Sequence, residues 1–169
     1  MKKIWAPWRM TYVRRQKKGG CLFCLISGQK GNEENLILHG GDTTFVVINR
    51  FPYNNGHLMV VPRRHCTDLE SLEIQEIAEL FHLLKLSIRV LATSLSPDGY
   101  NVGINLGKAA GAGMDHLHIH IVPRWSGDSN FMPVLSDTKV IPELVEQTYR
   151  KLRLAFQDAL ERTVGGHKI

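Results

Sequence analysis

Asp115-His116-Leu117-His118-Ile119-His120-Ile121-Val122-Pro123-Arg124-Trp125 places a histidine at every second position. Successive side chains of a β-strand point to opposite faces, so a strand over residues 115–125 gathers His116, His118 and His120 on one face. The alternate residues are leucine and isoleucine, which suit a core. Three side chains that titrate near neutral pH then stand in one row. The pattern predicts a chemically active strand face, and a polar, solvated face is the alternative.

Two kinds of chemistry fit this row, metal binding and nucleophilic attack. Neighbours on the same face of a strand are roughly 7 Å apart, which is too far for three imidazoles to share one ion. The spacing suits one histidine that binds a metal and a next one that attacks a substrate. His118 is the candidate nucleophile, because a neutral imidazole attacks phosphorus and forms a labile phosphoramidate, which divides the displacement into two steps.

A loop of small residues over 107–113 directly precedes the histidines and contains Gly107, Gly111 and Gly113. Small residues let backbone N–H groups approach a phosphate closely and bind the charge that develops on its oxygens. Many loops contain glycines, but the position of this one favours a phosphate-binding role.

Cys21 and Cys24 form a Cys-x-x-Cys pair, which together with two histidines makes a recognised closed zinc set. His65 and His116 are the candidates for the other two ligands. A reduced pair in a loop is the alternative, whereas no βαβ pattern follows that would indicate a redox motif. With three cysteines and no secretion signal, no disulfide scaffold is expected.

The composition bounds the class of protein. Of 169 residues, 43% are hydrophobic and 22% charged, as expected for one soluble globular domain. No apolar run is long enough to span a bilayer and no signal peptide is evident, so we expect a cytoplasmic protein without a membrane partner. The formal net charge of +5 suits an anionic small substrate such as a nucleotide.

Lysine and arginine are concentrated in residues 1–20, which also contain Trp5 and Trp8. The tryptophans indicate a basic arm that packs on the body of the protein or on a partner subunit. An arm that binds nucleic acid is the alternative, and we do not expect a nucleic-acid partner.

The order of the expected elements predicts an α+β sandwich with a mainly antiparallel sheet. Strands are expected over 36–39, 43–49, 57–61, 100–106 and 115–125. Helices are expected over 21–27, from a cap at Asp68 or Ser71 to about residue 94, and from Pro142 to about residue 163.

The stretch from His116 to Val122 resembles the motif of the histidine-triad (HIT) family. The resemblance extends to Val46–Arg50 and Gly56–Pro62, which are similar to the paired strands of that family, above all of its fragile-histidine-triad branch. The segments Trp5–Arg9 and Pro123–Asp128 look like a bacterial branch that includes diadenosine tetraphosphate phosphorylases.

The resemblance implies a HIT-like fold, with an antiparallel sheet of about five strands, a long central helix and a C-terminal helix. The implied HIT domain spans residues 21–125, between the arm at 1–20 and a C-terminal extension at 126–169. The implied protein is a homodimeric enzyme. It cleaves a dinucleoside polyphosphate or nucleoside phosphoramidate at the α-phosphate and passes through a covalent nucleotidyl-His118, as a hydrolase or a phosphorylase.

Site residues follow from the same resemblance. His118 would be the nucleophile, His120 would contact the α-phosphate, and His57 would sit beside the site. The residues implied in nucleotide binding are Asn49, which would hold the ribose hydroxyls, and Asn105, Gly111 and Gly113, which would line the phosphate. In zinc-bearing members the structural metal is held by positions that match Cys21, Cys24, His65 and His116.

The sequence departs from the family pattern just before the motif. Many members have Gly-Gln-Ser or Gly-Gln-Thr there, whereas this chain has Gly111-Ala112-Gly113 and therefore no side-chain hydroxyl for the phosphate or leaving group. A purine-nucleotide binding or sensing protein with little turnover is the alternative function.

Overall fold

The computed structural model describes residues 20–128 and 143–165. Its centre is a five-stranded sheet in which all four neighbouring pairs are antiparallel, in the order β1-β2-β3-β5-β4. The strands are β1 (Ile37–Gly40), β2 (Thr44–Ile48), β3 (Leu58–Pro62), β4 (Gly99–Ile104) and β5 (Ile119–Arg124). The α+β class and the antiparallel sheet expected from the sequence are confirmed.

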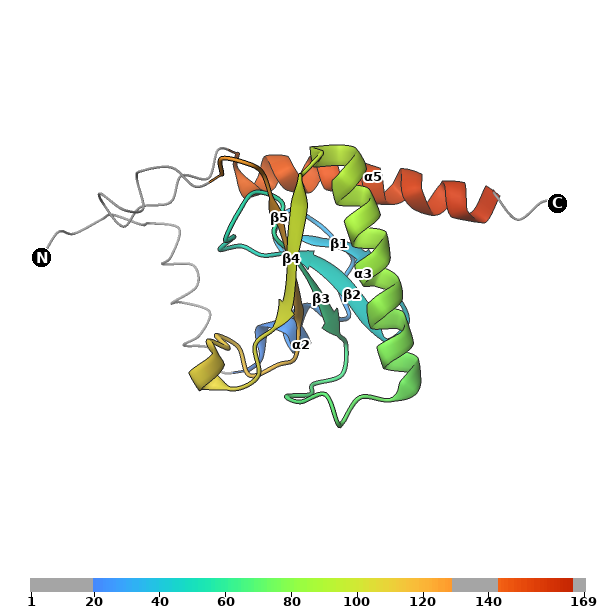
Figure 1. Ribbon diagram of the computed structural model, residues 1–169. Coiled ribbons are helices and arrows are strands. Elements are labelled where there is room, and N and C mark those ends of the chain that lie inside the picture. The colour runs from blue at the N-terminus through green and yellow to red at the C-terminus, as the bar shows by residue number, and fades with distance from the viewer. Residues whose placement is uncertain (1–19, 129–142, 166–169) are drawn as a thin grey trace, which may run out of the picture.

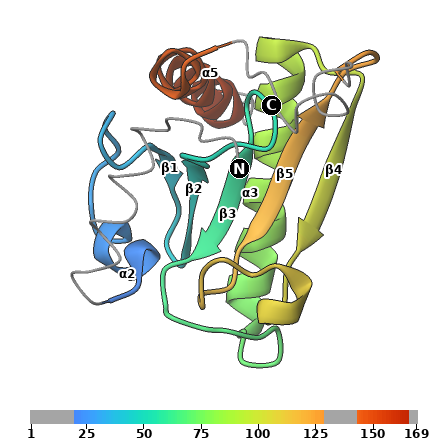
Figure 2. The ribbon, with the colours of Figure 1, turned by 90° about the vertical axis from the view of Figure 1, so that its left-hand side faces the viewer.

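Helices cover the sheet unequally (Figure 1). The helices are α2 (Leu22–Ile26), α3 (Ile74–Leu95), the 3₁₀ turn η1 (Lys108–Ala110) and α5 (Val145–Gly165). The long α3 runs along one face against β2, β3 and β5, and α5 packs on α3 and β1. Figures 1 and 2 place α2 and η1 near the same end of the sheet. None of the helices in the described parts of the chain is long and apolar enough to cross a membrane.

The core lies between the sheet and α3. Every residue of β2 and β3 is buried, because α3 covers one face of these strands and α2 and the adjoining loops cover the other. Helix α3 contributes a stripe of buried side chains at helical spacing, namely Leu80, Leu83, Leu86, Val90 and Leu91. The two central strands are therefore held rigidly, and they form the floor of the site described below.

The strand predicted over residues 115–125 is wrong at its beginning, because β5 starts at Ile119. The β3–β5 register pairs Val60 with Ile119, so two more steps would bring Leu117 opposite Pro62. Proline has no N–H to continue the ladder. The Leu117 N–H donates instead to the Cys66 carbonyl at 2.7 Å, so His116 and His118 lie in the segment just before the strand.

The cap predicted for the central helix is also wrong. Helix α3 begins after Glu73, whose backbone N–H donates to the Glu76 carboxylate at 2.9 Å. Asp68 accepts the Ser71 N–H at 2.8 Å and so closes a separate turn before the helix. The C-terminal helix begins at Val145, while Pro142 and the arm up to residue 19 lie outside the described residues.

Candidate active site

A pocket of about 380 Å³ opens between α2, the segment 34–36, β2 and the loop before β5. Five of the residues predicted from the sequence line it: Asn49, Gly111, Gly113, His118 and His120. Its other walls are largely apolar and come from Leu22, Phe23, Ile26, Leu36, Val47, Phe51, Tyr53, Met59 and Met114. Apolar walls with a few polar groups are typical of a site for a small polar ligand with an aromatic or apolar part.

The sheet register builds the floor of this pocket. Val47 pairs with Met59, and Met59 pairs with His120. Directly opposed residues of neighbouring strands project from the same face, so these three side chains form one row across β2, β3 and β5. His120 therefore projects its imidazole from a packed sheet, which fixes the position of the ring.

The protonation of His118 is set by the backbone. Its Nδ1–H donates to the His116 carbonyl at 2.7 Å, and a carbonyl can only accept. Burial lowers the pKa of His118, so the ring is neutral and its Nε2 carries a lone pair. Phe23 packs against the ring at a centroid distance of 5.3 Å. His118 therefore presents a fixed nitrogen nucleophile at the pocket wall.

His57 and His120 form a second fixed pair. The Tyr53 N–H donates to His57 Nδ1 at 3.1 Å, so the proton of a neutral His57 is on Nε2. That Nε2–H donates to His120 Nδ1 at 2.9 Å, which leaves the proton of His120 on its own Nε2. Burial and the two neighbouring histidines lower the pKa of His57 to about 3, and burial and His118 lower that of His120 to about 4. His120 therefore offers an N–H donor to the pocket that contains the lone pair of His118.

His57 itself does not touch the pocket. It is completely buried behind His120, so its place in the site is to orient that ring. Asn49 Nδ2 lies 3.3 Å from His57 Nδ1, and Asn49 Oδ1 accepts the Phe51 N–H at 2.9 Å. Asn49 is thereby anchored at the pocket edge.

The loop before the histidines turns at two glycines with positive φ, Gly107 (78°) and Gly111 (87°). Such angles are strained for residues with a side chain. A side chain on Gly113 would meet open space, consistent with a backbone that a phosphate can approach. Asn105 lies behind this loop, its Nδ2 3.8 Å from where a Cβ on Gly111 would be. Unlike the two glycines, Asn105 does not line the pocket.

A separate cluster joins Cys21, Cys24, His65 and His116, whose ligand atoms all lie within 4.8 Å of one another. Cys21 Sγ is 3.1 Å and Cys24 Sγ 3.6 Å from His116 Nδ1, and Cys24 Sγ is 3.4 Å from His65 Nδ1. Sulfur and nitrogen ligands of a tetrahedral zinc are separated by about 3.6 Å. The four predicted ligands, drawn from three segments, therefore have the spacing of a metal centre.

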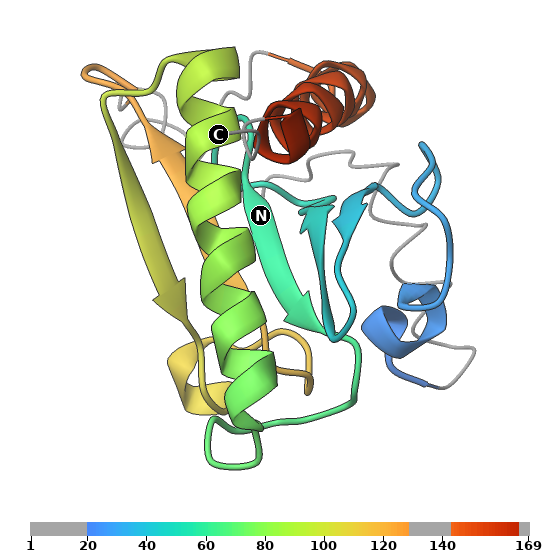
Figure 3. The same ribbon diagram turned by 90° about the vertical axis from the view of Figure 1, so that its right-hand side faces the viewer.

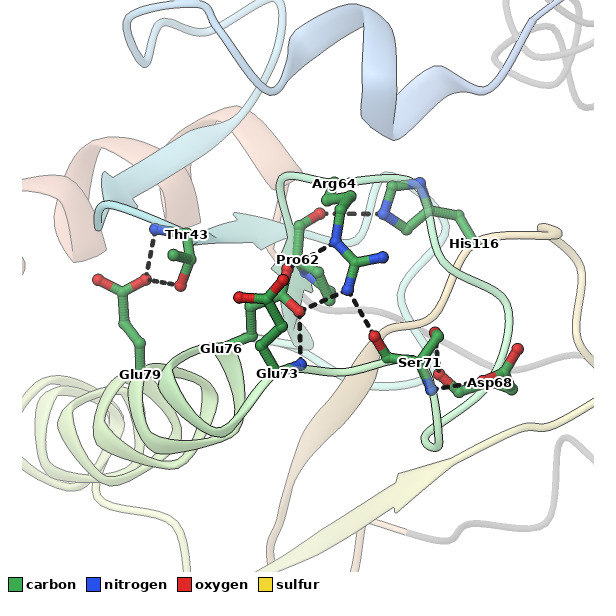
Figure 4. A network of polar contacts seen from close by, with 9 residues as sticks. All are labelled: Thr43, Pro62, Arg64, Asp68, Ser71, Glu73, Glu76, Glu79 and His116. Carbon is green, nitrogen blue, oxygen red and sulfur yellow. Dashed lines mark hydrogen bonds and ion pairs between the residues drawn. The ribbon is translucent and has the colours of Figure 1, made fainter.

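The chemistry of the cluster also fits a cation. Burial and the Cys21 thiol raise the pKa of Cys24, so a pair of thiolates is disfavoured unless a positive ion lies between them. The Nε2–H of His116 donates to the Pro62 carbonyl at 2.9 Å, which directs the lone pair of Nδ1 toward the cysteines. Figure 4 shows this bond beside Arg64, which ties the loop containing His65 to Glu76 of α3 at 2.6 Å.

Two contributors to the site were missed from the sequence. Tyr53, whose side chain is 54% exposed, has its ring centroid 4.8 Å from that of His57 and 5.8 Å from that of His120. Phe23 lies between the pocket and the cysteine cluster and contacts both His116 and His118. The only signal for either was an aromatic residue next to a motif, in Phe51-Pro52-Tyr53 and in Cys21-Leu22-Phe23-Cys24.

The chain is similar to several known proteins. A model of the HIT domain family matches residues 30–127. The AP-4-A phosphorylase of Mycobacterium tuberculosis is 41% identical over 162 residues, which are 90% of this chain and 83% of the relative. An adenylylsulfatase of Arabidopsis thaliana is 28% identical over 138 residues, 78% of this chain and 69% of the relative. A zinc-bound histidine triad family protein from Mycobacterium smegmatis is 29% identical with a TM-score of 0.68, covering 85% of this chain and 97% of that structure.

Proposed function

The chain belongs to the HIT domain family, and from this premise we propose that it cleaves dinucleoside polyphosphates at the α-phosphate through a covalent nucleotidyl-His118. The observation that carries the proposal is the pair of complementary nitrogens in one pocket. His118 Nε2 has a lone pair because its Nδ1–H donates to a carbonyl, and His120 Nε2 has a hydrogen because His57 donates to its Nδ1.

In the first step, His118 Nε2 attacks the α-phosphorus. The Nε2–P bond forms, the bond from phosphorus to the bridging oxygen breaks, and the electron pair departs with the nucleoside polyphosphate. The His116 carbonyl continues to accept the Nδ1–H and so stabilises the positive charge that the ring acquires. His120 donates its Nε2–H to an oxygen of the reacting phosphate.

The neutrality of His120 favours one class of leaving group. With a pKa of about 4, its ring donates a hydrogen bond at neutral pH but holds no extra proton to give away. The leaving group must therefore be stable as an anion, as the terminal phosphate of a nucleoside polyphosphate is. An amine leaving group needs a proton, so we place nucleoside phosphoramidates second.

The second nucleophile in our proposal is inorganic phosphate. The relative from Mycobacterium tuberculosis, 41% identical, is named a phosphorylase. Attack by phosphate on the nucleotidyl-His118 returns the electron pair to Nε2 and releases a nucleoside diphosphate. The same covalent step serves a hydrolase, in which water attacks instead.

Product analysis of diadenosine tetraphosphate, with and without inorganic phosphate, tests this function. We expect ATP and ADP, formed only when phosphate is present. ATP and AMP in either condition would make the protein a hydrolase, and the absence of any product would contradict the proposal.

For the cysteine cluster we propose a structural zinc ion held by Cys21, Cys24, His65 and His116. Bound there, the ion would supply a closed four-ligand cross-link and no reactive position. Two of its residues belong to α2, Cys21 as the N-cap and Cys24 within the helix, and Leu22, Phe23 and Ile26 of α2 form part of the pocket wall. The cluster therefore supports the pocket through α2.

We further propose a cytoplasmic homodimer with the body at residues 21–125, the arm at 1–20 and the extension at 126–169. The three free cysteines suit a reducing compartment. Strand β4 is at an edge of the sheet and exposes Asn101, Val102 and Gly103, which suits pairing with a second copy.

A further inference from the structure

Helix α5 lies outside the residues that match the family model, yet it is bonded to residues that flank one wall of the pocket. Figures 2 and 3 show α5 beside the β1 end of the sheet, close to the segment that precedes β1. That segment contains Glu34, Asn35 and Leu36, which line the pocket. Polar contacts join α5 to the residues on either side of these three.

Arg153 of α5 holds the beginning of β1. Its Nη1 donates to the carbonyls of Ile37 at 3.2 Å and Leu38 at 2.8 Å. The Tyr149 hydroxyl donates to the same Ile37 carbonyl at 3.3 Å. These bonds reach the residue that directly follows Leu36 in the chain.

Arg150, one turn earlier on the same helix, holds the other side of the segment. Its Nε and Nη2 donate to the two carboxylate oxygens of Glu33 at 2.7 and 3.0 Å. A bidentate pair fixes direction as well as distance. Residues 34–36 therefore lie between two anchors, Glu33 and Ile37, and α5 forms hydrogen bonds to both anchors.

The wall between these anchors is strained. Leu36 is 1% exposed and has a φ of 60°, in the left-handed region that a leucine rarely adopts. Asn35 is bonded on all sides: its Oδ1 accepts the N–H groups of Asn32 and Ile37, and its Nδ2 donates to Gln29 and Lys30. A strained residue persists where its surroundings over-determine it, and such residues concentrate at ligand-binding sites.

We propose that Arg150 and Arg153 are positioning residues that hold residues 34–36 as the nucleoside wall of the pocket. The inference rests on the proposed function, because it takes the ligand to be a nucleotide. Leu36 lines the pocket together with the apolar Leu22 and Ile26 of α2, and this apolar lining is suited to a base. The arginines then act on nucleotide affinity, and they leave the nucleophile untouched.

Arg63 supplies a matched control. Its Nε donates to the Gly41 carbonyl at 3.0 Å, so it ties down the residue that follows β1, whereas Arg153 ties down the beginning of that strand. Neither Arg63 nor Gly41 lines the pocket. Arg63→Met and Arg153→Met therefore both remove bonds to backbone carbonyls, one after the end of β1 and the other at its beginning, and only Arg153→Met removes bonds next to the wall.

The test measures the Kd of AMP by calorimetry and the kcat and KM for diadenosine tetraphosphate. For Arg153→Met and Arg150→Met we expect the Kd and KM to rise by roughly 3- to 30-fold, with kcat unchanged. Arg153→Lys, which keeps a donor, should recover part of the affinity. Arg63→Met should lower the melting temperature and leave the Kd as in the wild type.

Different results would overturn the proposed function and the positioning role of the arginines. A wild-type protein that binds no AMP would overturn the proposed function. A wild-type protein that binds AMP, together with arginine variants that bind it equally well, would overturn the positioning role. If Arg153→Met does not fold, Arg150→Met decides alone, because its ion pair with Glu33 is exposed and its loss leaves the core intact.

Discussion

Backbone groups decide, directly or through a neighbouring imidazole, which nitrogen of each histidine carries the proton. The Pro62 carbonyl holds Nε2–H of His116, the His116 carbonyl holds Nδ1–H of His118, and the Tyr53 N–H sets His57. In our proposal the three histidines of the motif therefore have three different roles: a metal ligand, a nucleophile and a hydrogen-bond donor. Identical side chains suit distinct roles because their hydrogen-bond partners differ.

Replacement of His57 tests this arrangement at the scale of one residue. In His57→Leu the tautomer of His120 is no longer fixed, and we expect kcat to fall by roughly 10- to 100-fold. His57→Gln keeps an acceptor for the Tyr53 N–H and a donor for His120, so its kcat should remain much closer to the wild type. Steady-state kinetics on diadenosine tetraphosphate measures both, and equal losses in the two variants would contradict the assignment.

The sequence was enough to predict most residues of this site, but it was not enough to predict which of their nitrogens carry a proton. Alternation and loop composition singled out His118 and the glycines, and ligand chemistry singled out the cysteine cluster. The tautomers could not be predicted, because they depend on carbonyls and N–H groups that only the fold brings near each ring. Tyr53 and Phe23 were missed for the same reason: their contacts are tertiary.

At the scale of elements, α2 is the piece with the least stability of its own. It has five residues, with no side-chain cap at Cys21, and so short a helix is not stable alone. The buried side chains of Phe23 and Ile26 attach α2 to the core. The cluster that contains Cys21 and Cys24 is the second attachment of this helix. The pocket wall supplied by α2 therefore depends on that cluster.

Removal of the metal should loosen this element. We expect chelation, or Cys21→Ser, to lower the melting temperature by several degrees and to weaken AMP binding, while His118 chemistry is affected only indirectly. Metal analysis of the freshly prepared protein should find about one zinc per chain. Protein without zinc, or a melting temperature that chelators do not change, would refute the structural metal.

The boundaries of helices and strands differ from those that local sequence patterns predict wherever tertiary contacts decide them. Strand β5 begins later than alternation predicts because Pro62 ends the ladder on the neighbouring strand, and α3 begins later because Asp68 closes its own turn. The existence and type of these elements followed from periodicity, which is local. Their ends depend on partners distant in the sequence.

Across the whole molecule, buried titratable groups make the fold sensitive to acid. His57 and His120 are neutral in the folded state, with pKa values of about 3 and 4, below the ordinary 6.5. On the α3 side, Glu79 accepts hydrogen bonds from Asp42 and Thr43, in the turn between β1 and β2, and from Thr44 at the start of β2. Figure 4 shows the bonds from Thr43. Although burial opposes the shift, these bonds lower the pKa of Glu79 to about 2.

The pH dependence of stability follows from these directions. Between pH 6.5 and about 3, His57 and His120 are protonated in the unfolded chain but neutral in the folded protein. The free energy of unfolding is therefore highest above pH 6.5 and decreases as the pH is lowered through that window. The contribution of Glu79 is complete above pH 4.5 and is lost toward pH 2. Urea denaturation at several pH values should therefore show Glu79→Ala less stable than the wild type at pH 7, with the difference shrinking below pH 4.5. A difference that does not change with pH would contradict the role of the carboxylate.

The covalent intermediate is the central claim, and intact-mass spectrometry tests it most directly. The protein is mixed with diadenosine tetraphosphate in the absence of phosphate and quenched rapidly in base, where a phosphoramidate survives. Peptide mapping then locates the added mass. We predict the mass of one adenylyl group on the peptide that contains His118, and none in His118→Gly, although this variant still binds AMP. Turnover by His118→Gly, or product formed by the wild type with no adduct at any time point, would contradict the account.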